Sequence, residues 1–208
     1  ILVFSAKSDR DEAPYFVTER IRGENLDERF EQLSLSKRGH IMEQVGELMA
    51  DLHSTIAFEG YGRLDLRDDR LIVRDLTGDW QAYFADMARG HVERLGGTPF
   101  EDLQPMAGQR LEDCLDVVPS DGVPRIVHDD FRPGNLLFAD GDPPEITAVL
   151  DWEQTLAGDP LYNLAQVEFL FIDAVFRDSD VCDQLRERLY AGYGTDGAFE
   201  PSTSYRAC

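Results

Sequence analysis

Residues 126–138 read IVHDDFRPGNLLF, and this stretch constrains the fold of the chain more than any other. Two short apolar runs enclose a polar centre, which predicts a strand on each side and a loop that the Pro and Gly can turn. The adjacent carboxylates of Asp129 and Asp130 would not stabilise a turn that has only a structural role, because like charges held close together repel. The stretch therefore predicts a loop that collects a cationic group.

Length and hydropathy indicate a globular protein. The 208 residues, of which 42% are hydrophobic, suit one ordinary domain, or one large lobe with a fragment of another. There is no apolar run of about 18 residues and no signal-peptide pattern, so we expect a cytoplasmic protein without a membrane partner. Cys114, Cys182 and Cys208 lack the paired spacing of zinc sites, and we expect them to be reduced.

The charge balance is strongly acidic. Asp and Glu number 41 against 20 Lys and Arg, which gives a net charge of −21. Nucleic acid polymers are disfavoured as partners, because binding them requires a cationic face. The acids are dispersed along the chain, which predicts a hydrated acidic surface of the kind expected in a salt-rich cytoplasm. The same dispersal weakens any inference that a local acidic patch binds a cationic substrate.

Hydrophobic periodicity predicts a short hairpin followed mainly by helices. A polar turn separates two β-type runs, Ile1–Phe4 and Tyr15–Glu19, which we expect to pair. Ser36 is the expected N-cap of a long helix with one apolar face that extends to Ile56. Further helices are predicted over 26–33, 78–95, 100–117, 161–176 and 181–190, with small strands and loops between 125 and 152.

The central loop resembles the catalytic loop of kinases, whose pattern is His, any residue, Asp, four residues and Asn. His128, Asp130 and Asn135 fit this pattern. Further along, an apolar strand ends at Asp151, where kinases place a metal-binding Asp. The protein-kinase tripeptide at that point is Asp-Phe-Gly, and this chain departs from it with Asp-Trp-Glu.

These motifs, followed by GDPLYNLA at residues 158–165, are similar to those of the aminoglycoside phosphotransferase and choline kinase group, which has a protein-kinase-like fold. Residues 16–26 resemble the hinge between the two lobes of that group, and residues 48–54 resemble the helix before its catalytic loop. The resemblance covers residues 14–170. It implies an α+β fold that consists mostly of a helical C-lobe with a residual N-lobe hairpin.

The resemblance also implies a division of the chain. Ahead of the hinge, a complete member carries a glycine-rich phosphate loop, a strand with a Lys and a helix with a Glu. Lys7 lies too close to the hinge strand to be that Lys. We therefore expect 1–22 to be a remnant of the N-lobe with the hinge, and 23–208 to be the helical C-lobe with the catalytic loop. We expect this chain to be a fragment of a longer kinase that lacks half of the ATP clamp, which leaves its own activity open.

The resemblance assigns roles residue by residue. Asp130 would orient the acceptor hydroxyl and accept its proton. Asn135 and Asp151 would hold Mg²⁺, which prefers hard oxygen ligands, together with the phosphates of ATP. In the hinge, backbone groups of Glu19 and Ile21 would contact the adenine.

Three neighbours of these residues have open or auxiliary roles. We expect His128 to be a scaffold of the loop rather than a proton carrier, and Arg132 is a candidate second cation for the transferred phosphoryl group. Asp129 stands where this group commonly has Gly. It either raises the proton affinity of Asp130 by repulsion or points to solvent.

The leading hypothesis is an ATP- and Mg²⁺-dependent phosphotransferase acting on a hydroxyl of a small molecule such as an aminoglycoside, an amino alcohol or a sugar. Glu168 and Asp173 could meet an amine of that acceptor. The alternative is a catalytically silent kinase-like binding or regulatory module. A third hypothesis is a metal-dependent hydrolase that uses Asp129, Asp130 and Asp151 around two ions.

Overall fold

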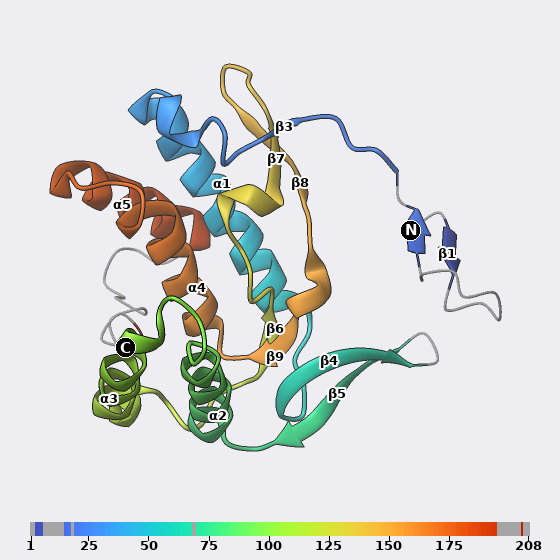
Figure 1. Cartoon of the computed structure of the whole chain (residues 1–208). Coiled ribbons are helices and arrows are strands. Elements are labelled where there is room, and N and C mark those ends of the chain that lie inside the picture. Colours follow the sequence, from blue (N-terminus) through green and yellow to red (C-terminus); the bar gives the residue numbers. More distant parts are fainter. Residues whose placement is uncertain (1–2, 6–14, 18, 68–69, 195–204, 206–208) are drawn as a thin grey trace.

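The structure is a computed structural model that describes residues 3–5, 15–17, 19–67, 70–194 and 205. Helices form most of the body, and the strands make three small antiparallel sheets (Figure 1). The predicted α+β class is confirmed. In the described part of the chain, no helix combines the length and the apolar character needed to cross a bilayer.

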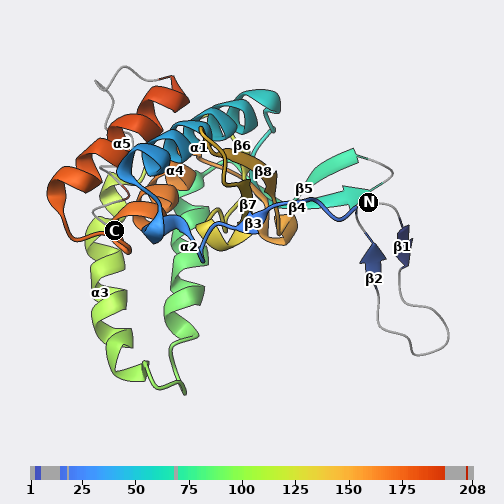
Figure 2. The same cartoon turned by 90° about the horizontal axis from the view of Figure 1, so that it is seen from above.

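The predicted N-terminal hairpin is present. β1 (Val3–Ser5) pairs antiparallel with β2 (Tyr15–Val17). The pair lies to one side of the helical body and is joined to it by an extended segment (Figures 1 and 2). Lys7 falls outside the described residues, and the division into 1–22 and 23–208 stays a prediction.

The main core forms where α1 (Leu35–Thr55) packs against α5 (Ser179–Tyr193). The two helices touch backbone to backbone, because a side chain at Gly46 or Gly192 would collide with the main chain of the other helix. Ser34 caps α1 by accepting a hydrogen bond from the backbone NH of Lys37, so the predicted cap at Ser36 is wrong by two residues. The buried apolar side chains of this core include Phe30, Ile41, Met42, Val45, Met49, Phe131, Phe138, Phe171, Leu185 and Leu189.

Two sheets lie beside α1. The first has the order β3 (Glu24–Asn25), β7 (Leu136–Ala139) and β8 (Glu145–Val149). The second has the order β5 (Arg70–Thr77), β4 (Tyr61–Arg67), β9 (Leu156–Gly158) and β6 (Arg125–Val127). The chain passes from the second sheet to the first between β6 and β7, and returns between β8 and β9. Both loops that carry the kinase-like motifs are therefore crossings between the same two sheets.

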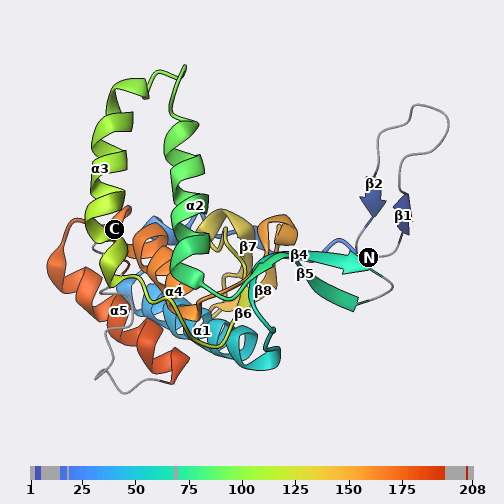
Figure 3. The ribbon, with the colours of Figure 1, turned by 90° about the horizontal axis from the view of Figure 1, so that it is seen from below.

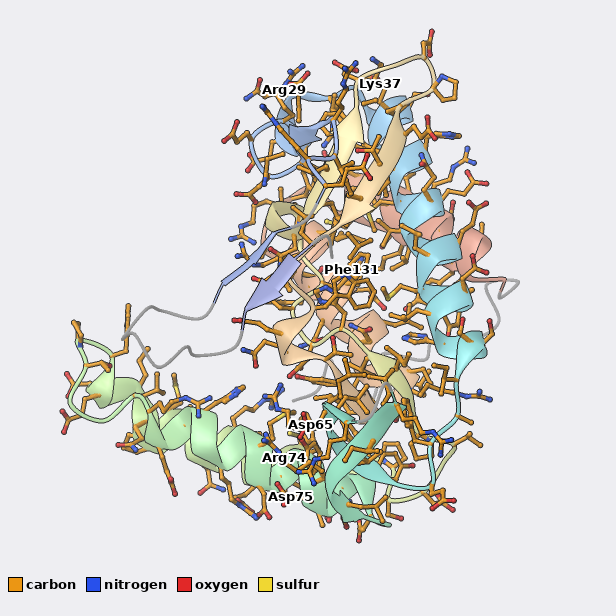
Figure 4. The ribbon with its side chains drawn as sticks, turned by 90° about the vertical axis from the view of Figure 1, so that its right-hand side faces the viewer. Arg29, Lys37, Asp65, Arg74, Asp75 and Phe131 are labelled. Atoms are coloured by element: carbon orange, nitrogen blue, oxygen red, sulfur yellow. The ribbon has the colours of Figure 1, made fainter. Side chains whose placement is uncertain are left out.

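The β4–β5 hairpin has no counterpart among the predicted elements. Its outward apolar residues are exposed, with Leu66 64% and Leu76 55% accessible, so the usual burial alternation is weak. Gly62 lies at a bulge with φ of 151°, where a side chain would collide with the carbonyl oxygen of Arg74. The hairpin runs along the base of α2, where Asp65, Arg74 and Asp75 mark it in Figure 4.

The helices α2 (Trp80–Glu93) and α3 (Gln104–Cys114) form a hairpin that projects from the body (Figures 2 and 3). The helix predicted over 78–95 is present as α2, and its Trp80 and Phe84 are buried in a second core with Tyr83 and Met87 packed against them. The predicted helix over 100–117 is instead three pieces: the 3₁₀ turn η2 (Glu101–Leu103), α3 and the 3₁₀ turn η3 (Leu115–Val117).

The remaining helical segments differ from prediction in length. Over 26–33 only the 3₁₀ turn η1 (Phe30–Gln32) forms. The predicted helix over 161–176 is α4 (Pro160–Glu168) continued by the π-helical turn η6 (Phe169–Asp173). Cys114 is disulfide-bonded, so the prediction that all three cysteines are reduced is wrong. Cys182 is free and buried.

Candidate active site

Two loops make up the candidate site. The first loop comprises residues 128–135 and ends in the 3₁₀ turn η4 (Pro133–Asn135), and the second comprises residues 150–155 and contains the 3₁₀ turn η5 (Trp152–Gln154). They are joined through the backbone of Leu150. Its NH donates to the carbonyl oxygen of Asn135 at 2.8 Å, and its own carbonyl oxygen lies 2.9 Å from Nε2 of His128. Because Asp151 is the next residue, its backbone is fixed beside the first loop.

Asp130 and Asn135 are in direct contact. The amide nitrogen of Asn135 donates to the Asp130 carboxylate at 2.8 Å and to the Asp130 carbonyl oxygen at 2.9 Å. No hydrogen bond among the described residues uses the amide oxygen of Asn135. Gly134 is held from β3, because its carbonyl oxygen accepts from the Asn25 amide at 2.9 Å. The pair therefore has one fixed orientation, with the amide oxygen left for another ligand.

Arg132 pairs with Asp130 itself. Its Nε lies 3.2 Å from Oδ1 of the carboxylate, and the two side chains are 46% and 33% exposed. An exposed pair of this kind contributes little to stability. The carboxylate of Asp130 is therefore accessible and can exchange Arg132 for another partner.

Asp151 has a left-handed backbone, with φ of 63° and ψ of 62°, and is exposed. The following residue, Trp152, turns back over the site: its indole NH donates to the carbonyl oxygen of Val149 at 3.0 Å. Its ring centre lies 4.7 Å from that of His128. The second loop thus presents a carboxylate to solvent and packs its aromatic ring on the first loop.

His128 is fully buried, and the ring contacts Phe131 as well as Trp152. Burial lowers its pKa, so the ring is neutral and donates from Nε2 to Leu150. Its Nδ1 is buried and has no hydrogen-bond partner among the residues that the structure describes. These contacts agree with the predicted scaffolding role.

Asp129 does not point to solvent, so that open alternative is wrong. Its side chain is 6% exposed, and its backbone is left-handed with φ of 58°. One carboxylate oxygen accepts from the Tyr162 hydroxyl at 2.8 Å and the Gln166 amide at 3.1 Å. The other lies 3.6 Å from Nη1 of Arg63. Burial raises the pKa of this carboxyl, while the Tyr162 hydrogen bond and the Arg63 charge oppose the rise.

Arg63, on β4, is a site residue that the sequence analysis does not select. The same Nη1 that faces Asp129 donates to the backbone carbonyl of Gln154 at 2.6 Å and to its side-chain oxygen at 3.0 Å. It therefore reaches both loops at once. No motif marks this residue, since it stands in an exposed, charge-rich hairpin.

The structure does not bring every candidate to the two loops. Glu19 and Ile21 are exposed in the segment between β2 and β3, and no hydrogen bond or ion pair among the described residues links either one to the site. Glu168 and Asp173, suggested for an acceptor amine, are both paired with Arg186, and Glu168 is fully buried. That suggestion is wrong for Glu168, since no acceptor can reach it.

The hydrolase hypothesis lacks its metal cluster. In the described part of the chain, no group of three or more His, Cys, Asp or Glu side chains is arranged to hold a metal ion. Asp129, one of the three acids that this hypothesis needs, is instead bound by Arg63 and Tyr162.

Comparisons with known proteins agree with this geometry. A family model described as the phosphotransferase enzyme family (APH) matches residues 2–203. Hygromycin-B 4-O-kinase of Escherichia coli is 25% identical over 167 residues, which cover 74% of this chain and 43% of the relative. The chain therefore spans less than half of that curated relative.

Solved structures share the fold at low sequence identity. The GDP and kanamycin complex of APH(2″)-IIIa has a TM-score of 0.64 at 16% identity and covers 98% of this chain and 61% of that one. A thermostable mutant of aminoglycoside phosphotransferase APH(4)-Ia, in its apo form, has a TM-score of 0.58 at 20% identity and covers 90% of this chain and 58% of that one. The predicted protein-kinase-like fold is confirmed.

Proposed function

Because the chain belongs to the phosphotransferase enzyme family, we propose that the protein transfers the γ-phosphoryl group of ATP to a hydroxyl of a small molecule. The observation that carries the proposal is the contact between Asp130 and Asn135, made directly beside the loop that presents Asp151. Phosphoryl transfer leaves little covalent work to a protein, so a site needs mainly to align the hydroxyl and neutralise charge.

Asp130 is the proposed base. Its carboxylate is accessible and is oriented by Asn135. In the reaction, the acceptor oxygen forms a bond to the γ-phosphorus as the bond from that phosphorus to the bridging oxygen breaks, and ADP leaves. The hydroxyl proton passes to Asp130. Arg132, which touches Asp130, is the proposed contact of the transferred phosphoryl group.

Asn135 and Asp151 are the proposed magnesium ligands. The amide nitrogen of Asn135 is used by Asp130, which leaves the amide oxygen for a cation, and the carboxylate of Asp151 is exposed. An amide oxygen and a carboxylate are the hard oxygen ligands that Mg²⁺ prefers, with nucleotide phosphates and water completing its shell. When bound, the ion supplies charge neutralisation at the phosphates.

The nucleotide and the acceptor are proposed by analogy as well as from the site. Solved neighbours were crystallised with GDP and kanamycin, and with AMP-PNP and hygromycin B, which supports a nucleotide and a polyhydroxylated amine as ligands of this family. We propose ATP as the donor, with backbone groups of Glu19 and Ile21 as its adenine contacts. The proposed acceptor is an aminoglycoside, an amino alcohol or a sugar.

An acceptor screen tests this function. The full-length protein is incubated with ATP, Mg²⁺ and single hydroxyl compounds at high salt, and ADP release is measured. We expect ADP only when an acceptor is present, and far slower ADP release from the Asp130→Ala variant. Nucleotide binding without turnover for any acceptor would favour the silent module, and phosphoester hydrolysis without nucleotide would favour the hydrolase.

A further inference from the structure

We infer that Arg63 and Asp129 are positioning residues of the candidate site, whose contact holds the first loop and the second loop in register. The inference rests on the proposed phosphotransfer function, since it assigns these residues a part in the same site. Neither residue is expected to touch the nucleotide or the acceptor.

The guanidinium of Arg63 is the physical link. Its Nη1 lies 3.6 Å from the Asp129 carboxylate in the first loop and 2.6 Å from the Gln154 carbonyl oxygen in the second. Asp129 is the neighbour of the proposed base, and Gln154 follows three residues after the proposed metal ligand Asp151. A shift of Arg63 therefore acts on both halves of the site.

The carboxylate of Asp129 is held in place by its contacts. The left-handed backbone conformation of this residue is sparsely populated by residues other than Gly, although Asp adopts it more readily than most, and such conformations persist only where the surroundings determine them. Here Arg63 on β4 and Tyr162 and Gln166 on α4 bind the two oxygens of the carboxylate. The same contacts direct this carboxylate to partners different from those of Asp130.

Arg63 is itself held on a regular strand. Its backbone pairs with Leu156 of β9, the strand that starts directly after the second loop. Next to it, the NH of Leu64 donates to the Thr155 carbonyl oxygen at 3.3 Å. A side chain anchored on a paired strand positions its partners more accurately than one on a free loop.

The test compares Arg63→Met with Arg67→Met in the full-length protein. Arg67 lies on the same strand, is 65% exposed, and among the described residues forms an ion pair only with Asp65 of its own strand. We expect Arg63→Met to lower kcat by about tenfold to a hundredfold, because misplacing reacting groups by about 1 Å has effects of this size. Any rise in the KM for ATP should be smaller than the fall in kcat, because Arg63 is not proposed to contact the nucleotide and acts on Asp151 only through the second loop. Arg67→Met should keep both parameters.

A second readout does not depend on turnover. Trp80 is fully buried and Trp152 is 46% exposed, so acrylamide quenching of tryptophan fluorescence reports mainly on the second loop. Arg63→Met should increase this quenching, and Arg67→Met should not. If the protein has no kinase activity with any acceptor, the proposed function fails while this measurement still tests the link. If Arg63→Met has the parent kcat and the parent quenching, the link is refuted.

Two further variants distinguish a positioning role of Arg63 from a non-specific disturbance of the fold. Arg63→Lys keeps the charge but cannot reproduce the planar guanidinium contacts, so we expect partial recovery of kcat relative to Met. If Arg63→Met does not fold, Arg63→Lys replaces it in both measurements. Asp129→Asn combined with Arg63→Met should lower kcat no more than the worse single change, because both remove one shared contact. Fully additive losses would overturn the inference.

Discussion

Nε2 of His128 lies 2.9 Å from the carbonyl oxygen of Leu150, the residue that precedes Asp151. Together with the hydrogen bond from the Leu150 NH to Asn135, this contact fixes both backbone polar groups of one residue to the first loop. The loop that carries Asp130 and the backbone that leads into Asp151 are thereby connected by direct hydrogen bonds within the protein.

His128 should remain a neutral Nε2–H tautomer in weakly acidic solution. Burial lowers its pKa from the usual value of 6.5, and the carbonyl oxygen of Leu150 requires a donor at Nε2. Ring ¹⁵N NMR at pH 6.5, where an unperturbed imidazole is half protonated, should show a mainly neutral ring with its proton at Nε2 and a bare nitrogen at Nδ1. A ring that is mainly doubly protonated at this pH would contradict the lowered pKa.

Replacing Asp130 by Ala should lower kcat by about 10²- to 10⁴-fold, the usual contribution of a general base. Nucleotide affinity should stay close to that of the parent, because Asp130 acts on the acceptor hydroxyl. Turnover assays and nucleotide titrations measure the two effects. Asp140→Ala is the matched control, since this exposed acid pairs with Arg29 and Lys37 at the other end of the molecule from the β4–β5 hairpin (Figure 4).

Asp151→Asn should weaken magnesium-dependent nucleotide binding while leaving magnesium-free binding unchanged. The substitution keeps the shape but replaces a charged carboxylate by a neutral amide, and weakening a direct ligand in this way should cost at least the roughly tenfold seen for outer-shell partners. Calorimetric titration of nucleotide with and without Mg²⁺ measures the difference. Equal affinities for parent and variant in the presence of Mg²⁺ would remove Asp151 from the proposed ligand set.

The stability of the fold should depend on pH through His53. Burial lowers its pKa to about 4, and the ring faces the Tyr193 hydroxyl and Asn163. Between pH 6.5 and 4 the unfolded chain binds the proton and the folded chain does not, so the free energy of unfolding falls as pH falls through this window. Its full contribution is up to about 3 kcal/mol.

Denaturant unfolding of the parent and of His53→Gln at several pH values isolates this effect, because the other acids titrate in both proteins. The stability difference between parent and variant should shrink from pH 7 to pH 4. A constant difference would show that His53 has an ordinary pKa in the folded protein.

Gly46→Ala should destabilise the protein by about 1–3 kcal/mol or more, the usual effect of overpacking. A methyl group there collides with the main chain of α5, which outweighs the better helix propensity of Ala. Gly90→Ala on α2 is the control, because its methyl group meets only the end of the Arg94 side chain at 3.9 Å. The control should gain about 0.5–1 kcal/mol in chemical denaturation, and a neutral Gly46→Ala would refute the close contact of α1 and α5.

The residues of the first loop could be predicted because the motif that identifies them lies within a few neighbouring positions of the sequence. His128, Asp130 and Asn135 lie within one short segment between two apolar runs, and the structure brings Asp130 and Asn135 into contact. The start of α1 was harder, since Ser34 and Ser36 are both good caps and only packing decides between them.

The link that Arg63 makes between Asp129 and Gln154 could not be predicted. It depends on the pairing of β4 with β9, which are distant in sequence, and β4 has little burial to mark it as a strand. The inward direction of Asp129 depends on a positive φ that Asp, unlike Gly, does not signal. The pairing of Glu168 with Arg186 likewise depends on how η6 and α5 pack.

The left-handed backbones of Asp129 and Asp151 limit which amino acids either position can accept. Gly, Asn and Asp tolerate this conformation, whereas Val, Ile and Thr are excluded by their branched side chains. A saturation library at the two positions, selected only for folded protein, should be enriched in those three residues. Selection for catalysis would then act on only a few amino acids at each position. Sequence variation at both positions should therefore be narrow during evolution.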